Sequence, residues 1–506
     1  MKNLFVPLLA ILLAGVGCAD NIEESKPNIL IILADDLGYG DVSSYGQNTL
    51  LTPEIDRLAE NGLRFTDGHC SSATCTPSRY ALLTGQYPWK NERARILQGN
   101  APLIIDPARP TIASILRNNG YATAVIGKWH LGLGNGNVNW NERVAPGPAE
   151  VGFDYSFILA ATQDRTPTVL LRNQEVVGLD PDDPLYVSYK ENFEGEPTGK
   201  ENPEMLKMHP SHGHNQSIQN GISRIGYQKG GKSAMWIDED LADNFTEDAI
   251  KWLKNHKDQP FFLYFALHQP HVPRTPHERF AGTSGLGPRG DVIKEADWSV
   301  GSLLNTLDEL GLTEKTLVVL SSDNGPVLDD GYHDDAVVRI GDHDVNGPLR
   351  GGKYSLLDAG TRVPFFVSWP GTIKPGVSEA LVSQVDLLAT IADILNIQVP
   401  DEAEDSEVLA NALLGRSETG RTELFMEAGG KVAMQKDGWY FIPPYRGPAV
   451  YSNVNIESGC SPDFQLYLKT DIGQEENLAV DNTDVIESLK DYYEEKSGLK
   501  INNIEK

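Results

Sequence analysis

The stretch "NILIILADD", residues 28–36, decides the fold, because an apolar run ends abruptly in the carboxylates Asp35 and Asp36. Three further apolar runs end in the same manner: "ATAVIGKWH" (122–130), "FFLYFALHQPH" (261–271) and "TLVVLSSDNG" (316–325). Short apolar runs that alternate with amphipathic helical segments are typical of an α/β domain with a mostly parallel central sheet flanked by helices. Ligands of such sheets bind beyond the carboxyl ends of the strands, so we expect these polar groups at one rim.

The polar groups at the four strand ends are candidate site residues. They are Asp35, Asp36, Lys128, His130, His268, His271, Asp323 and Asn324. Taken singly, each has an ordinary explanation: the aspartates as a turn, His130 as a hydrogen-bonded core histidine, and Lys128 as a surface lysine with a buried stem. Ionisable groups at the same end of four buried strands favour a functional site instead.

The aspartates and the asparagine among these residues offer only oxygen as a ligand atom. Hard cations prefer oxygen, and Ca²⁺ accepts about six to eight such ligands. Zinc prefers histidine or thiolate, and the histidines stand in separate motifs. We therefore predict a Ca²⁺ site at Asp35, Asp36, Asp323 and Asn324, with Mg²⁺ as the second choice.

The segment "SSATCTPSRYALLTG", residues 71–85, places Cys75 at the predicted start of a helix. Pro77 is tolerated in a first turn, and a helix amino terminus attracts negative charge. Together with the cation of Arg79, this setting predicts a lowered thiol pKa. However, no histidine is adjacent in sequence, and a thiolate is a poor ligand for a hard cation. A simple cysteine nucleophile therefore fits the segment badly.

The composition limits the classes of partner. The chain has 506 residues and a formal net charge of −28, which argues against general affinity for nucleic acid or an anionic membrane. If the substrate is an anion, positive charge must be gathered locally in a pocket. The oligomeric state is not indicated by the sequence.

The first residues have the layout of a secretory signal, with Lys2 followed by an apolar run too short to span a bilayer. Residues 1–17 are predicted to be the signal peptide, Cys18 the lipidated first residue of a bacterial lipoprotein, and 18–26 the tether. A plain signal peptide with an incidental cysteine is the alternative. We expect an exported protein, in the periplasm or anchored to the outer membrane, that meets the membrane only through its lipid.

The remaining chain divides in two. Residues 27–416 are predicted to be the α/β catalytic domain, and 417–506 a smaller C-terminal antiparallel sheet with a helix. The short alternating pieces "ELFMEAG", "KVAMQKDGWYFIP" and "FQLYLKTD" indicate that sheet, and "VIESLKDYYEEKSG" indicates the helix. Only Cys70, Cys75 and Cys460 follow Cys18, an odd number, so at least one of them is outside any disulfide.

Cys75, Pro77 and Arg79, followed by "YALLTG", resemble the signature of the type I sulfatases in the alkaline phosphatase superfamily. The other motifs are similar in the same order: "NILIILADDLGYGD", "GYATAVIGKWHLG", "HQPHVP", "SSDNGP" and "LRGGKYSLLDAGTRVPFFVSWPG". With the closing "LYLKTDIGQEENLA", the resemblance runs from about residue 27 to about 480. It implies an alkaline-phosphatase-like fold and a sulfuric ester hydrolase.

The resemblance also implies a role for each matching residue. Cys75 would be oxidised by a sulfatase-maturating enzyme to formylglycine, whose hydrate attacks sulfur and is a further calcium ligand. Arg79 would stabilise the hydrate, while Lys128 and Lys353 would hold the sulfate. His130 would act on the hydrate hydroxyl, and His271 would protonate the leaving alcohol, with His268 in a structural role.

Substrate contacts are expected from two further segments. "GFDYSFILAATQDRTP" aligns with the stretch that contributes to the family's sulfate pocket, and gives Thr162, Asp164 and Arg165. "GYHDDAVVRIGDHD" places His333, Asp334, Asp335 and His343 just past the metal strand, where they could face the sugar. The insert 165–240 carries His209, His212 and His214, which we interpret as glycan contacts or a polar loop rather than a metal cluster.

An exported sulfatase suggests a sulfated carbohydrate as substrate: a glycosaminoglycan, a mucin or an algal polysaccharide. A formylglycine-dependent phosphodiesterase or phosphonate monoester hydrolase is the enzymatic alternative. A glycan-binding lipoprotein without catalysis is the other, although every principal position of the signature is intact.

Overall fold

A ten-stranded sheet forms the centre of the protein in the computed structural model, which describes residues 26–46 and 48–501. Its order is β15-β2-β14-β13-β1-β12-β4-β5-β6-β7. The four strands that sequence analysis singled out are its adjacent, mutually parallel middle: β13 (Thr316–Ser322), β1 (Asn28–Ala34), β12 (Phe261–Ala266) and β4 (Ala122–Lys128). The predicted convergence of their polar ends is confirmed.

The strands on either side make the sheet mixed. β5 continues the parallel order, β6 and β7 are antiparallel, and on the other side β14 runs antiparallel to both β13 and β2. The bounds of these strands are β2 Gly62–Phe65, β5 Tyr155–Leu159, β6 Leu170–Arg172, β7 Glu175–Val176, β14 Phe365–Ser368 and β15 Gly376–Ser378. The predicted fold class, a mostly parallel sheet flanked by helices, is confirmed.

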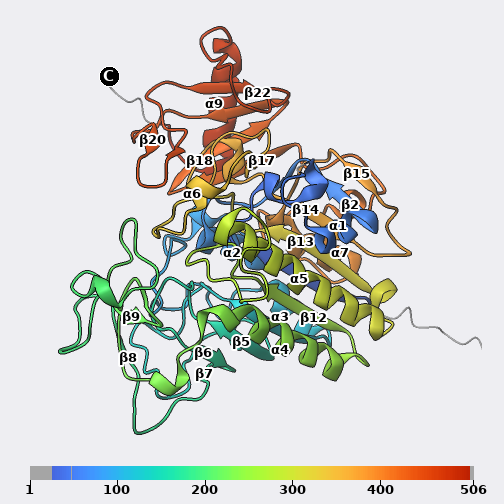
Figure 1. Ribbon diagram of the computed structural model, residues 1–506. Coiled ribbons are helices and arrows are strands. Elements are labelled where there is room, and N and C mark those ends of the chain that lie inside the picture. Colours follow the sequence, from blue (N-terminus) through green and yellow to red (C-terminus); the bar gives the residue numbers. More distant parts are fainter. Residues whose placement is uncertain (1–25, 47, 502–506) are drawn as a thin grey trace, which may run out of the picture.

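Helices cover both faces of this sheet (Figure 1). α1, α4 and α5 pack on one face together with Leu30 and Ile32 of β1, whereas α2, α3 and α7 pack on the other with Ile29 and Ile31. Alternate residues of one strand therefore enter two separate cores, which is why the strand is apolar throughout. The bounds of the helices are α1 Pro53–Glu60, α2 Cys75–Thr84, α3 Ile112–Asn118, α4 Leu241–His256, α5 Gly287–Glu309, α6 Ala336–Arg339, α7 Leu387–Ile394 and α8 Ala410–Leu413.

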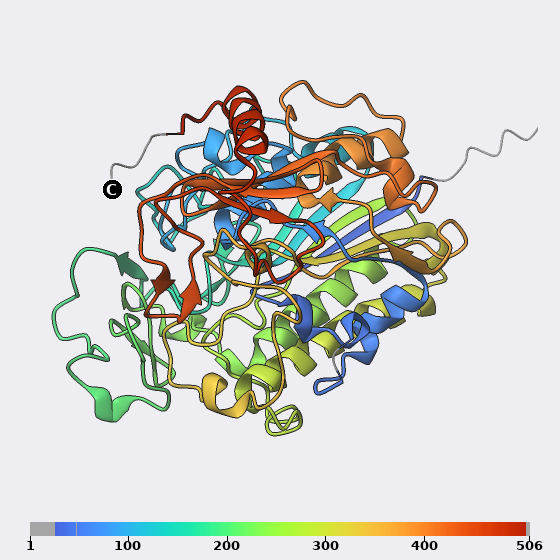
Figure 2. The same ribbon diagram turned by 90° about the horizontal axis from the view of Figure 1, so that it is seen from above.

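A second sheet forms the C-terminal part, as predicted. Its four antiparallel strands follow the order β17-β18-β19-β22, with bounds β17 Glu423–Ala428, β18 Lys431–Lys436, β19 Trp439–Ile442 and β22 Gln465–Leu468. The helix α9 (Thr483–Ser497) packs against it, and its core includes Ala73, Ala81 and Tyr87 from around α2. Figure 2 shows this sheet lying across the larger domain. A two-stranded hairpin, β20 (Val450–Tyr451) and β21 (Ile456–Glu457), stands beside it.

The insert between β7 and α4 has no α-helix; beside three 3₁₀ turns (Pro203–Met205, Lys232–Ala234 and Asp238–Asp240), its regular elements are short strands. These are β8 Tyr186–Ser188, β9 Ile218–Gln219, β10 Ile222–Ser223 and β11 Tyr227–Lys229. A further small pair joins β3 (Gly68–His69) to β16 (Val382–Ser383). In both ribbon views the insert projects to one side of the sheet (Figures 1 and 2).

The predicted signal peptide, Cys18 and most of the tether lie outside the described residues. Within residues 26–46 and 48–501, no helix combines the length and apolar character needed to cross a membrane. Cys70, Cys75 and Cys460 are all buried and free, so no disulfide joins Cys70 to Cys460.

Candidate active site

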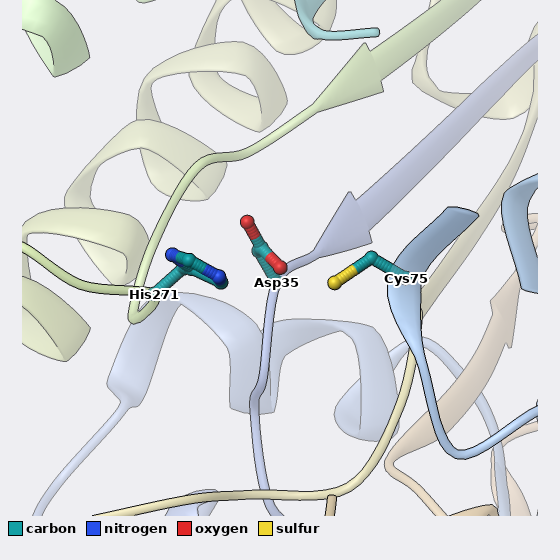
Figure 3. A group of neighbouring side chains, drawn as sticks. All are labelled: Asp35, Cys75 and His271. Carbon is teal, nitrogen blue, oxygen red and sulfur yellow. The ribbon is translucent and has the colours of Figure 1, made fainter. Parts of the chain in front are cut away.

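Three carboxylates and one thiol meet at the carboxyl ends of the central strands. Asp35 and Asp36 follow β1, Asp323 follows β13, and Cys75 begins α2. Their ligand atoms all lie within 4.8 Å of one another, and all four residues are buried. Figure 3 shows Asp35 between the Cys75 thiol and the ring of His271. Buried carboxylates this close together require positive charge among them.

The donor set fits a hard cation. The side-chain nitrogen of Asn324 donates to Asp36 Oδ1 at 2.7 Å. The other atom of that amide, Oδ1, is buried and accepts no hydrogen bond in the part of the chain that the structure describes. An unpartnered amide oxygen beside three carboxylates has the chemistry of a Ca²⁺ or Mg²⁺ ligand.

Three basic side chains converge on the same carboxylates. Lys128 Nζ lies 2.7 Å from both oxygens of Asp35. Arg79 donates to Asp323 Oδ2 from Nε at 2.8 Å and lies 2.7 Å from it through Nη2. Lys353 Nζ lies 2.9 Å from Asp36 Oδ2. The sequence-based expectation that positive charge would be gathered locally in this acidic chain agrees with this arrangement.

Burial and the neighbouring cations shift the pKa values of Asp35 and Asp36 in opposite directions. Burial raises the pKa of Asp35, and the Lys128 ammonium offsets only part of that change. Burial acts on Asp36 too, but Lys353 and His271 outweigh it and lower the pKa of that carboxyl. The pKa values of the two adjacent aspartates therefore move apart, because their neighbouring charges differ.

The environment of Cys75 corrects one expectation. α2 begins at Cys75, as the sequence indicated, but burial raises the pKa of the thiol to about 12 and Lys128 offsets only part of that. The cation of Arg79 does not outweigh this effect of burial, and its guanidinium is paired with Asp323. The side chain is therefore a neutral thiol and not the thiolate that a helix terminus and a cation suggested.

His130 and the Cys75 thiol line the same pocket. Nε2 of His130 hydrogen-bonds to Leu97 O at 3.0 Å, while its Nδ1 is buried without a partner among the described residues. Burial, followed by the cations of Lys128 and Arg165, lowers the pKa of His130 well below its ordinary value. With Nε2 donating to a carbonyl, Nδ1 of the neutral ring is a proton acceptor.

His271 lies closer to the acidic cluster than its separate motif suggested. Its Nδ1 hydrogen-bonds to Val272 O at 2.7 Å, and its Nε2 is 3.9 Å from Asp36 Oδ2. His271 groups with Asp35 and Cys75, and also with Asp36 and Asp330, at metal-ligand spacing. The prediction that only oxygen ligands surround the cation site was therefore incomplete, because a ring nitrogen of His271 lies at ligand spacing from Asp35 and Asp36. His268, three residues earlier, is buried and packs edge-on to Phe245 instead.

A narrow pocket opens onto Cys75. Its lining residues are Cys75, Ile96, His130, Asp164, Arg165, His214, His271, Asp330, Lys353 and Tyr354. Ile96, Asp330 and Tyr354 were not anticipated. The signal for Asp330 was its place shortly after β13, and that for Tyr354 its place beside Lys353. Ile96 comes from an irregular loop that carries no motif. Asp330 accepts from Lys353 Nζ at 2.7 Å and from the Tyr354 hydroxyl at 3.1 Å.

Thr162, Asp164 and Arg165 form one hydrogen-bonded group at this pocket. The Thr162 hydroxyl donates to Asp164 and accepts from Arg165. Arg165 Nη1 also lies 2.9 Å from Asp164 Oδ1. The Arg165 guanidinium, and the imidazole of His214 at 2.8 Å, overcome the effect of burial and hold the pKa of Asp164 well below its usual range. Of the three insert histidines, His214 alone lines the pocket; His209 is exposed.

The segment 331–344 follows β13 and was expected to face the sugar, but none of its residues lines this pocket. His333 is exposed, and its backbone N–H donates to His209 O at 2.9 Å. Asp334 is buried in an ion pair with Arg274 at 2.8 Å. His343 is buried 3.0 Å from Asp41, which Arg289 also binds. The expectation that Asp334 and His343 face the sugar is corrected, because Arg274 engages Asp334 and Asp41 engages His343 in the core. Asp335 is exposed near His333.

Comparisons with known proteins agree with this geometry. The family model described as Sulfatase matches residues 27–397. The chain is 47% identical to an N-acetylgalactosamine-6-O-sulfatase of Bacteroides thetaiotaomicron over 98% of this chain and 99% of that protein. It is 32% identical to arylsulfatase A of Bos taurus over 96% of this chain and 88% of that one. A solved B. thetaiotaomicron structure from work on the metabolism of multiple glycosaminoglycans has a TM-score of 0.93 and 48% identity, covering 94% of this chain and 100% of that chain.

Proposed function

The chain belongs to the sulfatase family and is a sulfuric ester hydrolase, and we propose that it removes the 6-O-sulfate of N-acetylgalactosamine in a sulfated carbohydrate. The observation that carries the proposal is the 47% identity to an N-acetylgalactosamine-6-O-sulfatase across nearly the whole of both chains. The similarity extends over 98% of this chain and 99% of that protein and is therefore not confined to one motif.

Sulfate binding is assigned to the buried cations at the pocket floor. Lys353 lines the pocket directly, and Lys128 lies beneath it on Asp35. Arg79 is fully buried on Asp323 and supports the same cluster. Fixed cations in a site screened from water stabilise an anionic transition state more strongly than solvated ones.

Calcium is proposed as the cofactor. Asp35, Asp36, Asp323 and Asn324 would hold it, with position 75 as a further ligand; Mg²⁺ is the second choice. The ion would supply positive charge against the sulfate oxygens. In the chain itself, the free Oδ1 of Asn324 is the atom that most directly supports this assignment.

Formylglycine, made from Cys75 by a sulfatase-maturating enzyme, is the proposed second component; it would supply a hydrate hydroxyl as the nucleophile. The raised thiol pKa supports this proposal, because an unmodified neutral thiol at position 75 is a weak nucleophile. His130 keeps an unprotonated Nδ1 beside position 75 and is the proposed proton acceptor. His271, on the opposite side of Asp35 (Figure 3), is the proposed proton donor to the leaving sugar oxygen.

The sugar side of the pocket is assigned to Asp164 and Arg165, with Thr162 and His214 holding them in place. A carboxylate and a guanidinium side by side present an acceptor and several donors, which suits two neighbouring sugar hydroxyls. His333 is not included, because it is exposed outside the residues that line the pocket. We also propose export and a lipid anchor at Cys18, which rest on the sequence of residues 1–18.

A substrate panel tests the proposal. N-acetylgalactosamine 6-sulfate, N-acetylgalactosamine 4-sulfate, an aryl sulfate and an aryl phosphate diester are compared by initial rates, with a sulfated oligosaccharide that also serves as a binding probe. We expect the 6-sulfate to have the highest kcat/KM. Preference for the phosphate diester would indicate the phosphodiesterase alternative. Binding of the oligosaccharide without release of sulfate would indicate a glycan-binding protein.

A further inference from the structure

The loop in front of Cys75 is an extension of the C-terminal sheet. β17 is an edge strand of that sheet, and Glu427 of β17 pairs in parallel with Ser72. The Ala73 N–H donates to Glu427 O at 2.7 Å, and the Glu427 N–H donates to Ser71 O at 3.1 Å. The backbone of residues 71–74 is thereby held by a part of the chain about 350 residues away.

The side chain of Glu427 adds a second connection. It is buried, its Oε2 accepts from the Ser72 hydroxyl at 2.5 Å, and its Oε1 accepts from the Gly430 N–H. The Ser72 oxygen in turn accepts from the Thr74 N–H at 3.1 Å and lies 3.1 Å from the Thr74 hydroxyl. Thr74 is the residue before Cys75 and the N-cap of α2, yet its side chain makes no capping hydrogen bond. The Thr74 hydroxyl is thus directed to Ser72 instead of the helix.

The loop 71–74 also contacts Tyr354, one of the residues that line the pocket. The Tyr354 N–H donates to Ala73 O at 2.8 Å. Tyr354 lines the pocket and directly follows Lys353, which binds Asp36. The loop 71–74 therefore connects three parts of the molecule: the C-terminal sheet, the start of α2 and the Lys353 wall.

We propose that Glu427 is a positioning residue for catalysis, which acts through Ser72 and Thr74 to fix residue 75 relative to the acidic cluster. The inference rests on the proposed role of position 75 as the nucleophile. The backbone pairing with β17 ends at Ala73, and the Thr74 carbonyl accepts from the Ser78 N–H at 3.2 Å. The chain from the Glu427 carboxylate to Ser72 adds a restraint on the Thr74 N–H and hydroxyl, and Thr74 is the residue to which position 75 is joined. A displacement of a reacting atom by about 1 Å can cost about a hundredfold in rate, so an interaction outside the pocket can control kcat.

Three variants of β17 test the proposal in the full-length protein. Glu427→Ala removes both hydrogen bonds of the carboxylate, and Glu427→Gln keeps one oxygen and one N–H to satisfy Gly430 and Ser72. Glu423→Ala, on the same strand, removes the contact to the Tyr492 hydroxyl at 2.7 Å and touches no part of the loop 71–74. The readouts are hydrogen exchange of the peptide that contains residues 70–79, the formylglycine content of that peptide by mass spectrometry, and kcat and KM for an aryl sulfate.

We expect Glu427→Ala to increase exchange in residues 71–75 and to lower kcat per formylglycine by about tenfold with little change in KM. Glu427→Gln and Glu423→Ala should stay close to the wild type. A Ser72→Ala variant should reproduce Glu427→Ala, and the double variant should be no worse than either, because both changes break the same chain.

Unchanged exchange in Glu427→Ala would overturn the proposal, as would a fall in kcat that is fully accounted for by lower formylglycine content or a smaller folded fraction. An equal effect in Glu423→Ala would assign the loss to general weakening of β17 and would also overturn it. If the wild type itself releases no sulfate, the proposed function is wrong, and the exchange comparison by itself then decides whether Glu427 restrains the loop.

Discussion

The ammonium nitrogen of Lys128 lies 2.7 Å from each carboxylate oxygen of Asp35, and both side chains are buried. The pair joins the ends of β4 and β1, two strands that β12 separates. Removing one partner of a buried ion pair leaves an unpaired charge in a medium that solvates it poorly. Loss of Lys128 should therefore both destabilise the domain and remove a positive charge from the candidate site.

Lys128→Met should lower the free energy of unfolding by about 3 kcal/mol, measured by urea denaturation with a chelator present. The matched control is Lys257→Met, which breaks the exposed pair of Lys257 with Asp258 and should change stability by less than about 0.5 kcal/mol. Similar values for the two variants would contradict the importance of burial.

Calcium added to chelated protein should raise the melting temperature, because a ligand that binds only the folded state stabilises it. At about a hundred times its dissociation constant, the gain is about 2.7 kcal/mol. Asn324→Ala, which removes the unpartnered Oδ1, should lose most of this response, while Asn453→Ala in an exposed turn should keep it. An unaltered calcium response in Asn324→Ala would exclude this side chain as a ligand.

Cys75→Ala should reduce sulfate release from an aryl sulfate below detection and leave the melting temperature within about 2 °C, since the thiol makes no hydrogen bond within the described residues and only a small side chain is lost. Cys460→Ala removes a different free, buried cysteine and should remain active. Full activity in Cys75→Ala would rule out the proposed nucleophile.

Arg165→Ala should raise KM for N-acetylgalactosamine 6-sulfate by about tenfold, the loss expected for one hydrogen bond to a charged group. Its kcat/KM for a small aryl sulfate should change by less than about twofold, because that substrate has no sugar hydroxyls. The control Arg172→Ala removes an exposed arginine that pairs with Asp248. Equal losses on both substrates would assign Arg165 to sulfate binding instead of sugar recognition.

Asp297 predicts a pH dependence of stability. Burial raises the pKa of this carboxyl to about 7, although it accepts the N–H groups of Ile55 and Glu54 at the start of α1. The folded protein therefore holds a proton that the unfolded chain releases at lower pH, so the free energy of unfolding falls as pH rises from about 4 through 7. Asp297→Asn should reduce the fall between pH 5 and 8 by about 2 kcal/mol. The control is Asp308→Asn, an exposed position on α5, the helix that carries Asp297; it should leave the slope unchanged.

The sequence alone predicted the sheet, the convergence of its polar strand ends and the residues of the acidic cluster. It did so because these features depend on local periodicity and on a general rule for parallel sheets, which place Asp35, Lys128, His271 and Asp323 at one edge whatever the details of packing. The helix that begins at Cys75 followed from the same local signals.

Tertiary structure decided how those residues meet. Burial reversed the expected pKa change of Cys75, and it assigned His343 and Asp334 to core ion pairs instead of the sugar. Ile96 and Glu427 carry no catalytic motif, and only long-range packing brings Ile96 to the pocket and Glu427 to the loop before Cys75. Desolvation and contacts between distant segments depend on every neighbour of a group, so no local pattern in the sequence records them.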